Sequence, residues 1–131
     1  MAELLTDQAR RCAEDGFGLW WWRERSGELV GQAGLNRTEV EGEPVVEVGW
    51  SISPERWGEG FAPEAARASL EWGFEVAGLD EIVAFTLIEN AASQRVMEKL
   101  GMGYVRDFER ERLPQVLYRL GRGEFGQETA T

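Results

Sequence analysis

The sequence of 131 residues contains no histidine and only one cysteine, Cys12. The absence of histidine excludes the Ser–His and Cys–His pairs that activate nucleophiles, and it excludes histidine-ligated metal sites. A single cysteine excludes a disulfide within the chain and a thiolate zinc cluster. We therefore expect no metal site, and any general base must be a carboxylate, a tyrosine, water or the only lysine, Lys99.

Basic residues and long hydrophobic runs are also scarce. The 14 Lys and Arg residues stand against 24 Asp and Glu, a net charge of −10, which disfavours nucleic acid and anionic membranes as partners. The same charge favours an amine-bearing partner by electrostatic steering, although acidity also simply keeps a protein soluble. No apolar run approaches the ~20 residues of a membrane span. The N-terminus has no signal-peptide core, so we expect a cytoplasmic protein.

Hydrophobic periodicity and turn residues predict one α+β domain over residues 1–120, with helices on the faces of a mixed sheet, and a flexible tail over residues 121–131. Strand side chains alternate, so Trp21 should face away from Trp20 and Trp22. Core packing is the expected role of the three tryptophans, and stacking of one of them on an acceptor is the alternative. The expected elements are a helix over 2–14, strands over 17–23 and 29–35, a polar loop over 36–44, a strand over 45–52, a helix over 63–77, a strand over 82–87, a helix over 91–100, and a hairpin of strands 104–111 and 115–120 around Leu113–Pro114.

The stretch Trp50–Glu64 carries a strand through a loop with Gly58 and Gly60 into a helix that has Pro63 in its first turn. Backbone N–H groups of such a loop point at one concavity, and the helix dipole favours negative charge there. Glycine lets the backbone approach a ligand closely. The residues alone predict a phosphate-binding loop, and a tight structural connection is the alternative.

The segment Glu89–Gly103 follows a buried strand and opens a helix at Asn90. Asn is among the preferred N-cap residues, so a capping role explains it without any ligand. Ser93, one turn into the helix, can likewise be a plain polar residue. Lys99 lies in the last turn, where the helix dipole favours a cation.

These two segments resemble the GNAT-type N-acetyltransferases over roughly residues 16–120. The loop Trp57–Ala65 is similar to their acyl-CoA pyrophosphate loop, Gln/Arg-x-x-Gly-x-Gly/Ala. Its sequence resembles the branch that acetylates ribosomal-protein N-termini. Trp57 departs from the pattern by removing a polar side chain. The second segment resembles N-x-x-S-x-x-V-M-x-K-L-G-F, where Met102 replaces the phenylalanine. The matching residues there are Asn90, Ser93, Val96, Met97, Lys99, Leu100 and Gly101.

The resemblance implies a GNAT-like fold, a central and mostly antiparallel twisted sheet flanked by helices. It implies an enzyme that moves an acetyl group from acetyl-CoA to a primary amine by direct attack in a ternary complex. Lys99 can also contact a CoA phosphate. The residues that the resemblance assigns to acetyl-CoA are Ser51, Ile52, Ser53, Trp57, Gly58, Glu59, Gly60, Phe61, Ala62, Asn90 and Ser93.

Two residues are candidates for catalysis. Glu47 lies in a central strand, on the face it shares with Val45 and Gly49, and a charge there suggests a cleft and a general base. A solvated or ion-paired strand residue is the alternative for Glu47, and the weaker candidates for the base are Glu41, Glu43 and Glu89. Many relatives carry a tyrosine where this chain has Met97, so Ser93 becomes the expected donor of a hydrogen bond to the leaving thiolate.

Relatives begin with an edge strand and a helix that this chain is expected to lack. The acceptor site would then be incomplete or completed by a second subunit, and an uncovered edge strand invites pairing, so we expect a homodimer. A non-catalytic acyl-CoA-binding module is the alternative function, and a purely structural dimerisation domain is a third. The acceptor itself, a small molecule or a protein N-terminus, stays open.

Overall fold

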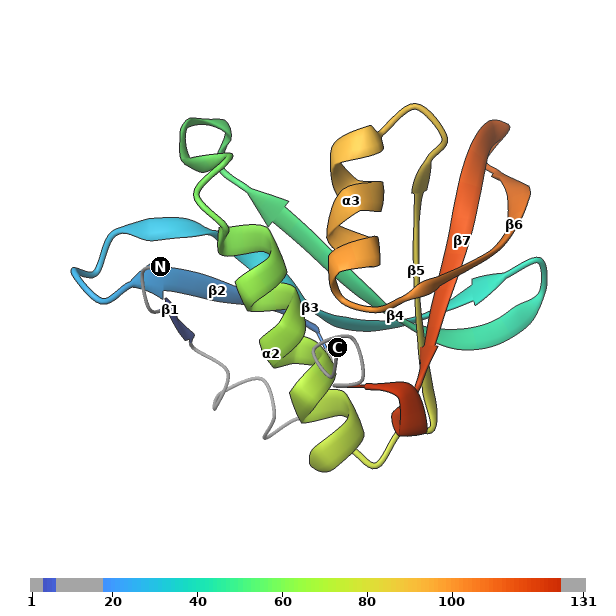
Figure 1. Cartoon of the computed structure of the whole chain (residues 1–131), viewed down its shortest axis with the longest axis horizontal. Coiled ribbons are helices and arrows are strands. Elements are labelled where there is room, and N and C mark those ends of the chain that lie inside the picture. Colours follow the sequence, from blue (N-terminus) through green and yellow to red (C-terminus); the bar gives the residue numbers. More distant parts are fainter. Residues whose placement is uncertain (1–3, 7–17, 126–131) are drawn as a thin grey trace.

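The computed structural model describes residues 4–6 and 18–125. These residues form a seven-stranded sheet in the order β1-β2-β3-β4-β5-β7-β6, with two α-helices (Figure 1). Only β4 and β5 pair in parallel among the described strands. This confirms the predicted α+β fold with a mostly antiparallel sheet. The elements are β1 (Leu4–Thr6), β2 (Gly18–Glu24), β3 (Leu29–Val40), β4 (Glu43–Ile52), α2 (Phe61–Glu75), β5 (Glu81–Leu87), α3 (Ala91–Lys99), β6 (Gly103–Arg110) and β7 (Leu113–Gly121).

Both helices cover the same face of the sheet, which we call the helix face. Their fully buried anchors include Leu70 on α2 and Met97 on α3, which pack against Val48 of β4 and Ala84 of β5. Trp20 and Trp22 also face α2, at 1% and 4% exposure, and Trp21 on the other face is 40% exposed. The predicted alternation of the three tryptophans is therefore confirmed.

The opposite face of the sheet, which we call the open face, carries no helix among the described residues. A smaller cluster of Val40, Val83, Phe108 and Leu117 covers part of it, with Val45 and Phe85 packed against the cluster. Val45 belongs to this face, so Glu47 and Gly49, two and four residues further along β4, share it.

The parallel pair β4–β5 determines where the sheet opens. The two strands pair at one position only, Glu47 with Val83. β4 continues beyond this point to Ile52, with β3 still paired along it but without β5. The sheet therefore opens between β4 and β5 beyond Glu47, and the glycine loop follows directly from the free end of β4.

The predicted polar loop over residues 36–44 is wrong. β3 runs on to Val40 and β4 begins at Glu43, and the two pair without interruption up to Val40 and Glu43. Glu41 and Gly42 form the two-residue turn, with φ of 51° and 84°. Such turns match the twist of a hairpin, so cross-strand pairing outweighs the polar composition of the segment.

Two other elements, one near each end of the chain, differ from those we predicted. Leu4–Thr6 pairs as a strand with β2 where we predicted a helix over residues 2–14, and the rest of that helix lies outside the described residues. The closing hairpin turns at Glu111–Arg112, both with positive φ, and not around Leu113–Pro114. Pro114 lies within β7, where its carbonyl accepts from the N–H of Ile88.

The helix boundaries are close to those predicted. α2 begins two residues early, at Phe61, because Gly60 adopts a left-handed φ of 87° that serves as the N-cap, and Ala77 lies beyond its end. Asn90 caps α3 as predicted: its side chain accepts from the Ser93 N–H. Ala92, in the first turn of α3, is exposed.

The segment after β7 lies in what we expected to be a flexible tail. Gly121 ends β7, a 3₁₀ helix follows at Arg122–Glu124, and Phe125 packs on Phe74 of α2 with ring centroids 5.4 Å apart. Residues 126–131 lie outside the described residues.

Candidate functional site

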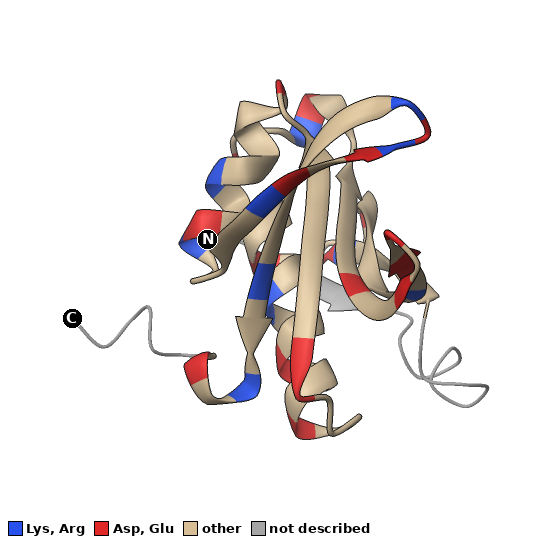
Figure 2. Ribbon diagram, turned by 90° about the vertical axis from the view of Figure 1, so that its right-hand side faces the viewer, with Lys and Arg blue, Asp and Glu red and all other residues tan. Residues whose placement is uncertain are grey.

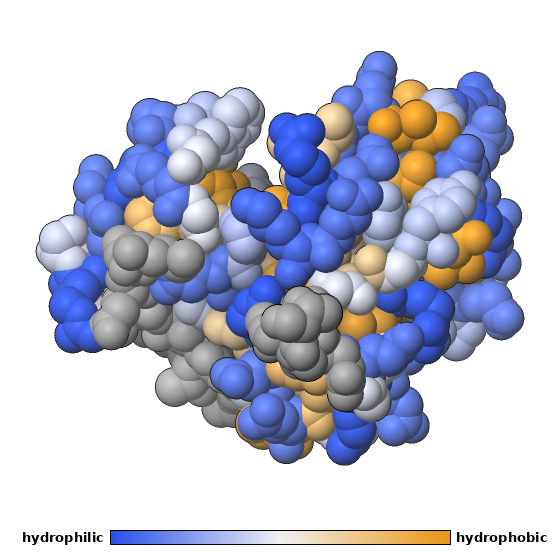
Figure 3. Space-filling model, in the orientation of Figure 1, coloured by the Kyte–Doolittle hydropathy of each residue, from blue (hydrophilic) through white to orange (hydrophobic). Residues whose placement is uncertain are grey.

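A cavity of about 870 Å³ lies on the helix face, between the end of β4, the glycine loop and α3. Figure 3 shows the surface hollowed between this loop and α3. Its lining residues are Trp50, Ser51, Ile52, Arg56, Trp57, Gly58, Glu59, Gly60, Phe61, Ala62, Pro63, Asn90, Ala92, Ser93, Arg95, Val96 and Lys99.

The glycine loop presents backbone donors to this cavity. The first hydrogen bond of α2 runs from the Glu64 N–H to the Gly60 carbonyl, 3.3 Å. The N–H groups of Phe61 and Ala62 precede it, and residues at this position have no acceptor within their own helix. Gly58 and Gly60 both have φ near +85°, at 84° and 87°, a conformation that side chains disfavour. An anion of phosphate size is suited to such a helix N-terminus.

Arg56 connects the glycine loop to the β2–β3 hairpin. Its guanidinium lies 2.8 Å from Glu24, 3.1 Å from Glu28 and 3.1 Å from Glu59, and 4.9 Å from the centre of the Phe61 ring. Hydrogen bonds to Glu59 and then to Glu24 raise the pKa of Arg56, so it stays charged. One cation, Arg56, is therefore paired with all three of these carboxylates near the candidate anion site.

The opposite wall of the cavity is one side of α3. Asn90 Oδ1 accepts from the Ser93 N–H at 3.1 Å, and Asn90 Nδ2 donates to Thr86 Oγ1 at 3.1 Å. Arg95 and Lys99 are exposed along the same wall, one turn apart. They bring positive charge to a cavity in a protein that is acidic overall.

The structure brings together all the residues predicted to bind acetyl-CoA except Ser53. Ser53 lies beside the cavity, where its N–H donates to the Val30 carbonyl at 2.9 Å. Sequence reasoning missed Trp50, Arg56, Pro63, Ala92, Arg95 and Val96 as lining residues. The helical spacing of three residues from Ser93 to Val96 could have found part of that wall. The binding roles of all these residues stay predictions.

Glu47 lies on the open face, where β4 and β5 last pair, and does not line this cavity. Burial raises the pKa of the Glu47 carboxyl, and the charge of Arg110 and a hydrogen bond with Asn36 partly oppose this rise. Asn36 faces Glu47 across β3 and β4. Arg110 is fixed by hydrogen bonds to the Glu39 carbonyl, 2.7 Å, and Thr38 Oγ1, 3.2 Å. Glu47 is thus a half-buried carboxylate with a raised pKa, as a general base requires.

The other candidates for the base are less suited. Glu41 is ion-paired with Arg106, whose Nε donates to Glu41 Oε1 at 2.9 Å. Glu43 and Glu89 are exposed, whereas Glu47 is half-buried. Figure 2 shows acidic and basic residues interspersed along β6 and its turn into β7, which is the surface that Glu41 contacts.

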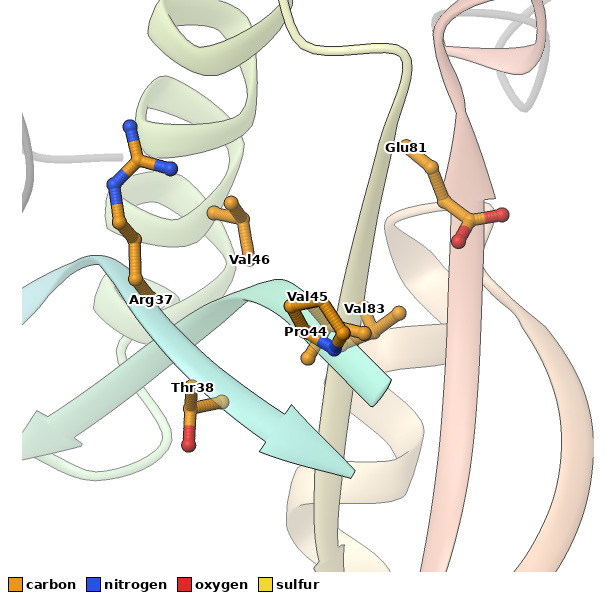
Figure 4. A pocket seen from close by; sticks show the side chains of 7 residues that line it. All are labelled: Arg37, Thr38, Pro44, Val45, Val46, Glu81 and Val83. Carbon is orange, nitrogen blue, oxygen red and sulfur yellow. The ribbon is translucent and has the colours of Figure 1, made fainter. Parts of the chain in front are cut away.

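A second hollow, of about 330 Å³, lies at the opposite end of the β4–β5 pair. Figure 4 shows its seven lining residues, Arg37, Thr38, Pro44, Val45, Val46, Glu81 and Val83. Glu81 is paired there with Arg119, 2.6 Å away. This hollow contains no glycine loop and no helix N-terminus, and none of the predicted site residues lines it.

Within residues 4–6 and 18–125, no helix is long and apolar enough to cross a membrane. The same residues contain no group of three or more metal-binding side chains placed to hold an ion.

Known proteins share both the sequence and the fold. The model of the family described as "Acetyltransferase (GNAT) domain" matches residues 2–103. The chain is 36% identical over 108 residues to the Bacillus subtilis protein YkkB, covering 80% of this chain and 63% of that protein. It is 35% identical over 99 residues to an Aspergillus fumigatus FsC-acetyl coenzyme A-N(2)-transacetylase, covering 71% of this chain and 42% of that one.

The fold agrees with these matches. A GNAT-family acetyltransferase from Bacillus anthracis superposes with a TM-score of 0.70 and 30% identity, covering 81% of this chain and 67% of the other. The chain spans less than two thirds of the length of both curated relatives. The family match extends from the first strand through the glycine loop and α3, and on this evidence the chain belongs to the GNAT acetyltransferase family.

Proposed function

We propose that the protein is an acetyl-CoA-dependent N-acetyltransferase that acts on a primary amine. One observation carries the proposal: the cavity of the glycine loop reaches the free end of β4 at Trp50–Ile52, and Glu47, where β4 and β5 last pair, lies just before that end on the other face of the sheet. A thioester held between the two strands would be accessible from both faces. The acceptor would then approach from the open face.

The helix face would hold acetyl-CoA. The N–H groups of residues 58–62 and the α2 dipole would bind the pyrophosphate, and Arg95 and Lys99 would add positive charge along α3. The pantetheine arm would pair with the free backbone of β4 at Ser51–Ser53, as an added strand does. Asn90 would position that arm, and Ser93 lies one turn into α3.

Reaction requires a neutral amine, and most amines are protonated at neutral pH. Glu47 would accept the proton, directly or through water. The neutral amine nitrogen then forms a bond to the thioester carbon, and the carbon–sulfur bond breaks. The proton displaced from the attacking nitrogen passes through water to the departing thiolate of CoA, and Glu47 returns its own proton to solvent. Ser93 would donate a hydrogen bond to that thiolate. Met97 is 1% exposed in the core, and its thioether has no proton to donate, so it cannot serve as the acid.

The acceptor is less closely specified. The sequence of the loop from Trp57 to Ala65 resembles the branch that acetylates ribosomal-protein N-termini, which supports a protein N-terminus as the acceptor. One relative is named as a transacetylase of an N(2) position. A protein N-terminus is a primary amine, and the name of this relative places its acceptor at a nitrogen. A panel of amines that includes peptide N-termini is therefore the screen that follows from the proposal.

We further infer a homodimer that forms through an edge of the sheet. β6 is an edge strand among the described residues, with Tyr104 57% and Val105 38% exposed. Figure 3 shows hydrophobic side chains over the β5–β7–β6 end of the molecule. An exposed edge strand with apolar side chains is suited to pairing. Size-exclusion chromatography with light scattering should give twice the chain mass, and the mass of one chain would contradict the inference.

Calorimetric titration with acetyl-CoA tests the proposed function. Gly60→Glu places bulk and negative charge at the α2 N-cap and should abolish binding. Gly42→Glu is the matched control, because Gly42 has a similar φ, +84°, with nothing within 4 Å, in a turn outside the cavity. Binding lost only in Gly60→Glu, together with release of thiol in the amine panel, supports the enzyme. Binding without turnover indicates the acyl-CoA-binding module, and no binding by the folded chain overturns both.

A further inference from the structure

Gly49 lies in the middle of β4, on the open face and two residues after Glu47. Residues two apart on a strand lie on one face, with Cα atoms ~6.4–6.8 Å apart. Gly49 is therefore the neighbour of the proposed base on that face. It also lies beyond the single β4–β5 pair, so no strand among the described residues pairs with its other flank.

A glycine inside a strand weakens it, because glycine has no side chain to pack and loses the most backbone freedom on folding. Gly34, which pairs with Gly49 across β3 and β4, has a clear structural reason. A Cβ on Gly34 would lie 2.2 Å from the Gly18 carbonyl oxygen and 3.1 Å from Leu19 Cα. The close approach of β2 therefore requires glycine at position 34.

Gly49 has no such reason. A Cβ at this position would meet no atom of the described residues within 4 Å, and the φ of Gly49 lies outside the left-handed region. Neither packing nor backbone conformation calls for glycine there. The open space that glycine leaves lies beside Glu47, where the strands separate.

We propose that Gly49 is a specificity-determining residue: its missing side chain leaves the space that a substituent on the carbon next to the acceptor nitrogen occupies. This inference rests on the proposed function, with Glu47 as the base. The favoured acceptor is then a primary amine on a branched carbon, as in the α-amino group of an amino acid or peptide. A side chain at position 49 excludes the branched carbon before it excludes a slender, unbranched amine.

Glycinamide and alaninamide test this, because they differ by one methyl group on the carbon next to the nitrogen. The kcat/KM for each is measured by release of CoA thiol, at saturating acetyl-CoA, for the wild-type chain, Gly49→Ala and Gly49→Val. Gly49→Ala should lower kcat/KM for alaninamide by about tenfold more than for glycinamide, the scale of one methyl group in a fitted pocket. Gly49→Val should lower both.

Gly103→Val is the matched control, because a Cβ at Gly103 also meets nothing within 4 Å and Gly103 does not line the cavity. Acetyl-CoA affinity and the melting temperature should be preserved in all three variants, which separates blocked access from misfolding. Equal kcat/KM values in wild-type, Gly49→Ala and Gly49→Val would overturn the inference while leaving the enzyme proposal standing. A wild-type chain that binds acetyl-CoA and acetylates no amine would overturn the proposed function first, and this inference with it.

Discussion

The two faces of the sheet around the β4–β5 divergence differ in how they are built. On the helix face, one continuous stretch of backbone, residues 58–62, forms the wall of the cavity beside the N-terminus of α2. On the open face, separate strands supply single side chains: Asn36 from β3, Glu47 from β4 and Arg110 from β6. A backbone site depends on local conformation, whereas a side-chain site depends on how distant segments come together. Substitutions on the helix face should therefore change the affinity for acetyl-CoA. Substitutions on the open face should change the rate of reaction with the acceptor.

The largest effect is expected on the open face. Glu47→Gln removes the proposed base and should lower kcat by about 10²–10⁴-fold, the usual contribution of a general base. Acetyl-CoA affinity should be unchanged, because Glu47 does not line the cavity. Steady-state kinetics and calorimetry on the same preparation check both. Activity close to wild-type would contradict this account, because the open face would then contribute no essential group to the reaction.

Leu70→Ala tests how much the packing of α2 on the helix face contributes to the stability of the fold. Leu70 on α2 is fully buried against the main core, so its truncation should lower the free energy of unfolding by about 2–5 kcal/mol. Glu47→Gln should instead leave stability unchanged or higher, because burial disfavours the charged carboxylate. Urea denaturation of both variants measures the contrast. A larger loss of stability in Glu47→Gln than in Leu70→Ala would mean that Glu47 is structural.

Asn90→Ala distinguishes a structural role of Asn90 in the cavity wall from a role in binding acetyl-CoA. Loss of the N-cap bond to the Ser93 N–H should cost about 0.5–2 kcal/mol of stability. Asn90→Asp retains a capping oxygen and is the matched control. If Asn90 also positions the pantetheine arm, acetyl-CoA affinity falls in Asn90→Ala by more than the loss of stability explains. Unchanged affinity in a folded Asn90→Ala chain would leave Asn90 as a cap alone.

The smallest effect is a change in pH dependence. The raised pKa of Glu47 predicts an acid limb of kcat/KM above the ordinary glutamate value of about 4.3, because the base acts only when ionised. Arg110 favours the ionised form, so Arg110→Gln should raise the pKa of Glu47 further and move that limb to higher pH. Arg106→Gln, which removes a cation paired with Glu41, is the control. A shift to lower pH in Arg110→Gln would contradict the assignment.

The sequence predicted the helix face well and the open face only in part. The glycine loop and the Asn90 cap could be recognised because their chemistry lies in contiguous segments with fixed spacing. Glu47 could be assigned to the correct face because strand side chains alternate. Arg110 could not be predicted as its neighbour, because it follows Glu47 by 63 positions and reaches β3 only through the fold.

Two further features show why some structure escaped prediction. Residues 36–40 are mostly polar, yet they extend β3 because β4 pairs with them throughout. Arg56 lies in the loop sequence, but its contacts with Glu24 and Glu28 depend on the β2–β3 hairpin folding back toward that loop. In both cases tertiary pairing outweighs local composition.

The central claim is that acetyl-CoA enters from the helix face and meets the acceptor at the β4–β5 divergence beside Glu47. A crystal structure of the chain with bound CoA tests it most directly. We predict the pyrophosphate against the backbone of residues 58–62, the pantetheine arm along the free end of β4, and the sulfur at the divergence within reach of a water bound to Glu47. CoA bound elsewhere, such as in the hollow lined by Val45 and Glu81, would contradict the account.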